Sequence, residues 1–228
     1  MTLIFPLLLF LIFALCVAFL LREGMWSNAV RLVNMITAGL LAMNFFEPVA
    51  KLLDDQVDAT YTYFWDFVSL WVLFALSLLI LRLLTDTISR VRVRFLMAAD
   101  RTGGIIFAVC CGWFIVCFTT ATLHTAPLAR HFLYGGFKVP LERNFLGLAP
   151  DWQWLGFVRY VSGGVYSRGL SDEERRDGKH GSGELAVFDA RDLEPARTFM
   201  YRYAMRRDAV EGMADSGSFR VTSGGPKR

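Results

Sequence analysis

Apolar residues fill the first half of the chain in long, continuous blocks. Four blocks are long enough to cross a bilayer as an α-helix, because an apolar core of roughly 30 Å takes about 20 helical residues. They cover residues 3–21, 25–46, 63–84 and 103–123. None alternates between apolar and polar residues as outer-membrane strands do. The pattern predicts an all-α membrane protein, with four transmembrane helices in a compact bundle over residues 1–125.

The rest of the chain has the composition of a soluble, α-rich and partly disordered tail. Residues 126–170 are rich in aromatic side chains and form a juxtamembrane segment, whose aromatic residues either rest on the membrane surface or pack a small core. Residues 171–184 are charged and glycine-rich, as flexible linkers are. Acidic residues and Pro195 mark the start of a helix in the segment 185–215. Residues 216–228 are predicted to be disordered.

The basic residues of the short connections predict the orientation. Arg22 follows the first block, the segment 47–60 is acidic, and the third connection is rich in arginine. The positive-inside rule counts Lys and Arg, so it places the first and third connections in the cytoplasm. We therefore expect a multi-pass protein of the bacterial inner membrane, with both termini outside the cytoplasm.

Three arginines of the third connection alternate with apolar residues, namely Arg90, Arg92 and Arg94. Near an anionic leaflet each is worth about 1 kcal/mol of attraction. This segment is either a plain topology signal or a specific site for a lipid or a partner.

Among the polar side chains inside the predicted spans, three are candidates for a functional role: Arg31, Asn34 and Asp66. Intramembrane polar residues often mark a transport pathway. However, Arg31 and Asp66 each lie near the start of their helix, in opposite leaflets of the predicted topology, where the side chain reaches water. Asn34 is of a type that joins neighbouring helices by hydrogen bonds. Anchoring and helix packing are the first interpretation for the three residues, and transport is the alternative.

Small residues predict close helix packing. Gly104, Ala108 and Gly112 recur at every fourth position and form a groove on one helix face, and Ala38 and Ala42 form a second one. These grooves predict a compact bundle and a contact surface for a protein partner or for a second copy of the chain.

Composition narrows the classes of function. A hydrophobic content of 54% fits a protein that is half in the membrane, and no part of the chain is basic enough for nucleic acid. The cysteines all lie in apolar blocks and have no metal-ligand spacing: Cys16, Cys110, Cys111 and Cys117. The sequence holds no catalytic motif. We predict neither enzymatic activity nor a cofactor or metal.

Two short motifs carry a family resemblance. Arg22-Glu23-Gly24-Met25-Trp26 leads into the second block, and Asp100-Arg101-Thr102-Gly103-Gly104, followed by Gly112, opens the fourth. With the four-helix plan and the acidic central connection, they resemble the colicin V production protein (CvpA) family over about residues 1–125. The resemblance implies a bacterial inner-membrane protein linked with the production or export of a peptide toxin, and it implies no catalytic residue.

Two hypotheses follow. In the first, the protein is a CvpA-like accessory protein that works through protein partners in toxin production, toxin export or envelope maintenance. In the second, it is a small oligomeric channel or transporter whose lumen is lined by Arg31, Asn34 and Asp66.

Overall fold

The described part of the chain is entirely helical. The computed structural model describes residues 3–56, 62–88, 97–126, 145, 147–163 and 203, and they contain no strand. The five helices are α1 (Ile4–Leu20), α2 (Met25–Gln56), α3 (Thr62–Ile88), α4 (Met97–Leu123) and α5 (Pro150–Gly163). The prediction of an all-α fold is confirmed for these residues.

Three helices are long and apolar enough to cross a membrane. Their spanning parts are Met25–Asp54 of α2, Phe64–Thr87 of α3 and Ala99–Leu123 of α4. The apolar helix α1 has 17 residues, which is the lower end of the length range for a span. The fold therefore supports a membrane protein with three long spans, and a fourth span by α1 stays a prediction.

Three helices extend beyond their predicted limits. α2 was expected to end at residue 46 but continues through Pro48 to Gln56, α3 continues from residue 84 to Ile88, and α4 starts at Met97 instead of residue 103. The edge of an apolar block marks where lipid contact ends. Charged residues continue a helix into water without difficulty, because Lys and Glu are good helix formers.

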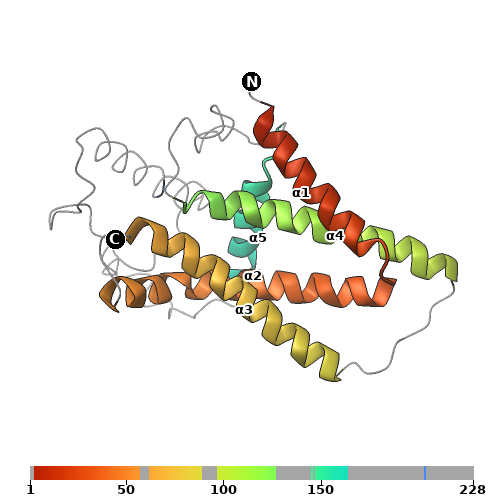
Figure 1. Ribbon diagram of the computed structural model, residues 1–228, viewed down its shortest axis with the longest axis horizontal. Coiled ribbons are helices and arrows are strands. Elements are labelled where there is room, and N and C mark those ends of the chain that lie inside the picture. The colour runs from red at the N-terminus through yellow and green to blue at the C-terminus, as the bar shows by residue number, and fades with distance from the viewer. Residues whose placement is uncertain are drawn as a thin grey trace.

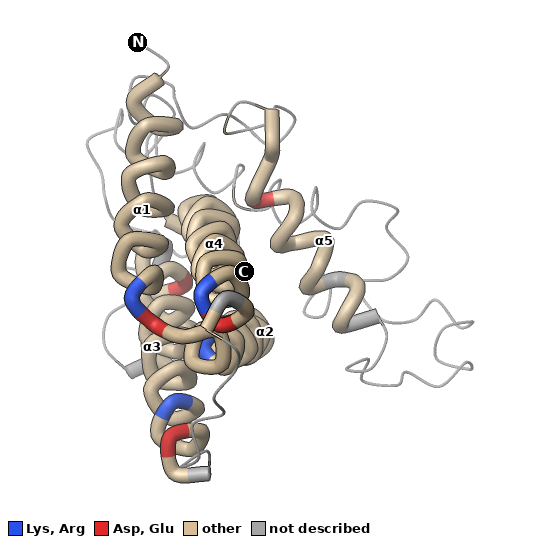
Figure 2. Tube along the Cα trace, turned by 90° about the vertical axis from the view of Figure 1, so that its right-hand side faces the viewer, with Lys and Arg blue, Asp and Glu red and all other residues tan. Residues whose placement is uncertain are grey.

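The helices form a bundle around α2 and α4. α2 packs against α3 and α4, while α1 packs against α4 (Figure 1). α5 lies across α4 and α2 instead of along them (Figure 1). Charged residues are few along the helices and gather toward their ends, as expected for a bundle surrounded by lipid (Figure 2).

An aromatic cluster forms the centre of the bundle. The rings of Phe74 and Phe118 stack with centroids 4.4 Å apart, and Trp154 meets Phe114 edge to face at 5.0 Å. These residues come from α3, α4 and α5, so α5 belongs to the same core as the long helices. Ala38 and Ala42 of α2 are fully buried in this core.

The tail contains a helix that was not predicted: α5 lies in the segment 126–170, for which no helix was expected. Tyr203, in the segment 185–215 that was predicted to be helical, is helical and buried against the central cluster. The predicted linker at 171–184, the predicted disorder at 216–228 and the remainder of the segment 185–215 lie outside the described residues.

Candidate functional site

The turn between α1 and α2 meets the first turn of α4. The backbone N–H of Met25 donates a hydrogen bond to Asp100 Oδ1 over 2.9 Å, although the two residues are 75 positions apart. The carboxylate thus lies at the N-terminal ends of both helices, where the helix dipoles favour negative charge. Beside it, a side chain at Gly103 would collide with that of Met25.

Glycines allow the two segments to approach this closely. A Cβ atom on Gly104 would lie 3.1 Å from the carbonyl oxygen of Glu23, and one on Gly24 would lie 3.1 Å from Asp100 Oδ2. The first of these neighbours is backbone and cannot rotate away. An alanine at position 104 would therefore push the two backbones apart by a few tenths of an ångström.

A buried asparagine completes this contact. Asn28 Nδ2 donates to the carbonyl oxygens of Leu20 and Gly104, both over 3.0 Å, and the Cys111 thiol donates to Asn28 O over 3.7 Å. One side chain thus links the end of α1, the start of α2 and the start of α4. We call the set Gly24, Asn28, Asp100, Gly103 and Gly104 the glycine junction.

The predicted small-residue groove faces the inside of the chain. A Cβ on Gly112 would lie 2.9 Å from Val17 and 3.1 Å from Phe13 of α1, and Ala108 is fully buried. With Gly104 against the α1–α2 turn, the groove is occupied by the chain's own first helix. It therefore offers no open face to a partner.

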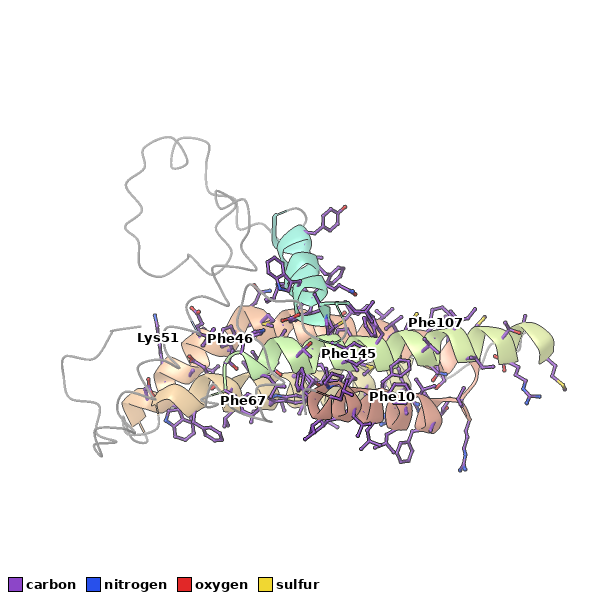
Figure 3. The ribbon with its side chains drawn as sticks, turned by 90° about the horizontal axis from the view of Figure 1, so that it is seen from above. Phe10, Phe46, Lys51, Phe67, Phe107 and Phe145 are labelled. Atoms are coloured by element: carbon purple, nitrogen blue, oxygen red, sulfur yellow. The ribbon has the colours of Figure 1, made fainter. Side chains whose placement is uncertain are left out.

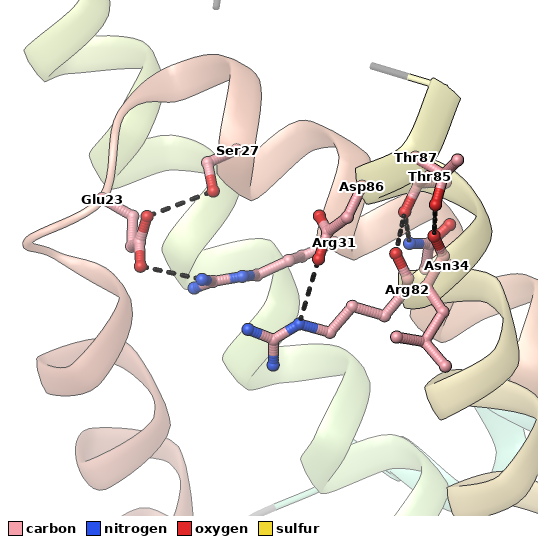
Figure 4. Close-up of polar contacts among 9 residues, drawn as sticks. Glu23, Ser27, Arg31, Asn34, Arg82, Thr85, Asp86 and Thr87 are labelled. Atoms are coloured by element: carbon pink, nitrogen blue, oxygen red, sulfur yellow. Dashed lines mark hydrogen bonds and ion pairs between the residues drawn. The ribbon is translucent and has the colours of Figure 1, made fainter. Parts of the chain in front are cut away.

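The polar residues near the start of α2 are engaged within the chain (Figure 4). Arg31 Nη2 lies 2.7 Å from Glu23 Oε1, and this ion pair is partly exposed. Asn34 Nδ2 donates to Thr85 Oγ1 of α3 over 3.0 Å, which joins two of the long helices. Asn34 is only 6% exposed.

Asp66 lies toward the opposite end of the bundle, near the start of α3. It is 3% exposed, and the Tyr203 hydroxyl donates to its Oδ2 over 3.4 Å. Arg31 and Asp66 therefore interact with different partners at different ends. Arg90, Arg92 and Arg94 lie outside the described residues.

A buried ionisable pair, which the sequence did not indicate, joins α4 and α5. His124 Nε2 lies 3.0 Å from Asp151 Oδ2, and both side chains are almost completely buried. His124 directly follows the C-terminal end of α4, and Asp151 is in the first turn of α5, so each helix dipole favours the charge its residue can carry. The adjacent Pro150 and Asp151 form a recognisable helix start, which was the available signal.

No constellation suited to metal chemistry exists among the described residues. In that part of the chain, no three His, Cys, Asp or Glu side chains gather as metal ligands would. The polar contacts described above join helices to one another. The fold and these contacts define a helical membrane protein held together by a few interior polar links.

Comparison with known families identifies the family to which this membrane protein belongs. The family model described as colicin V production protein matches residues 5–133, more than half of the chain. The chain belongs to this family, as its motifs indicated. It is a CvpA-like bacterial membrane protein of a family linked by name to toxin production, and not of a known enzyme family. No curated protein and no solved structure matches the chain.

The matched range divides the molecule. It contains α1 to α4 and the whole glycine junction, but it ends before α5 and Asp151. The helix α5 and its buried pair with His124 are thus additions to the part of the fold that the family model covers.

Proposed function

We propose that the protein is a non-enzymatic accessory protein of the bacterial inner membrane, which supports the production or export of a colicin V-type toxin, or maintains the envelope, by binding protein partners. The family match over residues 5–133 is the observation that carries this proposal. In this proposal α1 is a fourth span and both termini lie outside the cytoplasm.

The polar contacts favour the accessory role over a pore. A lumen formed by several copies needs polar side chains on an outer face of each copy. Asn34 and Asp66 are instead buried within a single chain, and Arg31 is paired with Glu23. Such contacts are typical of residues that hold helices together.

We place the partner surface outside the groove of Gly104, Ala108 and Gly112. Because α1 fills that groove, we assign partner binding to the polar chain that follows α5. In this assignment the helical bundle holds the protein in the membrane, and the tail binds the partner protein.

A complementation experiment tests the proposal. The gene is deleted in a strain that produces a colicin V-type toxin, and the full chain or a chain ending at residue 163 is supplied from a plasmid. We expect secreted toxin to fall in the deletion strain, to return with the full chain and to stay low with the shortened chain. Immunoblots of the membrane fraction establish that both forms are present in equal amounts.

Two outcomes contradict the proposal. An unchanged toxin yield in the deletion strain would show that the protein has no role in toxin production. Full recovery with the shortened chain would show that the partner binds the membrane bundle and not the tail. A reporter fused after Arg228, active only on one side of the membrane, tests the predicted location of the C-terminus.

A further inference from the structure

The charge-free parts of the long helices indicate where the middle of the membrane lies. In α2 the charge-free stretch runs from residue 32 to 46, with Gly39 at its centre, and in α3 it runs from 67 to 81, with Phe74 at its centre. Charged side chains are strongly disfavoured at the bilayer centre, so these stretches mark the apolar layer. Gly39 and Phe74 therefore lie near its middle.

Trp154 of α5 reaches this same level. A Cβ on Gly39 would lie only 2.9 Å from the Trp154 ring, so the indole occupies the notch that this glycine leaves on α2. The ring also meets Phe118 at a centroid distance of 5.8 Å, and Phe118 stacks on Phe74. The core contacts of α5 are thus made at half the depth of the bundle.

α5 is too short to cross the membrane. It has 14 residues, a length found in re-entrant helices and in buried core helices. It runs across α4 and α2 and projects from the side of the bundle (Figures 1 and 3). A helix that meets the bundle at this level and in this direction has lipid on its open side.

Two polar side chains near the start of α5 bond inside the chain, whereas the buried indole N–H groups of Trp152 and Trp154 have no hydrogen-bond partner among the described residues. Asp151 pairs with His124, while Gln153 accepts from Trp113 Nε1 over 3.0 Å and donates to the carbonyl oxygen of Leu148 over 2.9 Å. Farther along, the outward face presents Gly156, Phe157 and Tyr160, and the last two are 39% and 81% exposed. Phenylalanine suits contact with acyl chains. Arg159 is the one charged residue of α5 after Asp151, and arginine, like tyrosine, keeps its polar tip at the headgroups while its apolar stem lies among acyl chains.

We propose that α5 is a re-entrant helix that lies inside the bilayer, wedged by Trp154 against Gly39, with its outward face against lipid acyl chains. This inference does not depend on the role in toxin production, and α5 lies outside the range that the family model matches.

Spin labels on the outward face test this proposal. All four native cysteines are replaced by alanine, and single cysteines are introduced by Phe157→Cys or Tyr160→Cys in the full chain, reconstituted in phosphatidylcholine liposomes. Val109→Cys on a spanning helix supplies a lipid-exposed reference, and Asp86→Cys at the end of α3 supplies a water-exposed one. Oxygen concentrates in lipid and a water-soluble nickel chelate stays in water, so the ratio of their collision rates reports the surroundings of each label.

We expect the labels at positions 157 and 160 to match the one at 109, with an oxygen-to-nickel ratio several-fold above that at 86. A ratio like that at 86 places α5 in water and overturns the proposal. Immobile labels that neither collider reaches also overturn it, because a second copy or another protein then covers the face.

A matched pair of glycine variants tests the wedge. Gly39→Ala puts a methyl group against Trp154, whereas Gly156→Ala on α5 meets nothing within 4 Å. We expect the first variant to raise nickel access at position 160 several-fold and the second to leave it unchanged, in protein that remains monodisperse. Equal nickel access in the two variants contradicts the wedge.

Discussion

The two ends of α4 are joined to their neighbours by different physical means. At its start, the glycine junction brings backbones together, and a single carboxylate caps the neighbouring helix. At its end, His124 and Asp151 join two helix termini through a buried pair of ionisable side chains. The first contact depends on the absence of side chains and the second on a hydrogen bond between two buried side chains. They should therefore respond differently to substitution.

The largest effect is expected at the His124 end. His124→Leu removes the imidazole from the buried Asp151 carboxylate, and breaking a buried pair from one side costs about 3 kcal/mol. The double variant His124→Leu/Asp151→Leu should recover much of this loss, because it leaves no buried charge behind. Free energies of unfolding in detergent micelles measure both. A double variant no more stable than the single one would show that the carboxylate is not the source of the loss.

Gly104→Ala tests the contact at the start of α4. Its new methyl group meets the carbonyl oxygen of Glu23, which cannot rotate away, so we expect a loss of about 1–3 kcal/mol from overpacking. Gly156→Ala is the control, since open space surrounds that position and alanine favours a helix. Thermal unfolding followed by circular dichroism compares the two. Equal midpoints would contradict a close approach at the glycine junction.

Asp100→Ala removes the carboxylate of the glycine junction while leaving its glycines in place. The N–H of Met25 loses its acceptor, and the loss of such a cap costs about 1 kcal/mol. Asp86→Ala is the matched control, because Asp86 is largely exposed and only 3.8 Å from Arg82 within one helix. Urea or SDS titration of both proteins gives the difference. If the control loses as much stability as the variant, Asp100 is only a surface charge.

The smallest effect is expected between the two ends. Asn34→Leu breaks the hydrogen bond to Thr85, and such links between membrane helices are worth about 0.6 kcal/mol. Thr37→Val is the control, since the Thr37 hydroxyl bonds only within α2, to the carbonyl oxygen of Val33. The same unfolding measurement, made on both variants, resolves this difference only with repeated titrations. A larger loss for Thr37→Val would contradict the assignment.

The sequence predicted the features that depend on local pattern. The start of α2 at Met25 and the end of α4 at Leu123 agree with the apolar blocks. The spacing of Gly104, Ala108 and Gly112 indicated a close approach, but it did not indicate that α1 is the helix that packs there. Nothing in a repeat of small residues specifies its partner.

The features that were missed depend on contacts between distant segments. α5 was overlooked because its aromatic residues had two reasonable surroundings, the membrane surface or a small core. Only the notch at Gly39 and the rings of Phe114 and Phe118 decide between them. In the same way, His124 and Asp151 are 27 positions apart, and no local spacing links them.

The central claim is that the polar residues of the spans link helices of the same chain and do not line a pore. A solute-flux assay with the purified protein in liposomes tests this most directly. We predict that ion and small-solute release equals that of empty liposomes, and that Asn34→Leu and Asp66→Asn leave it at that level. Release by the native chain that either substitution abolishes would contradict the account and establish the pore.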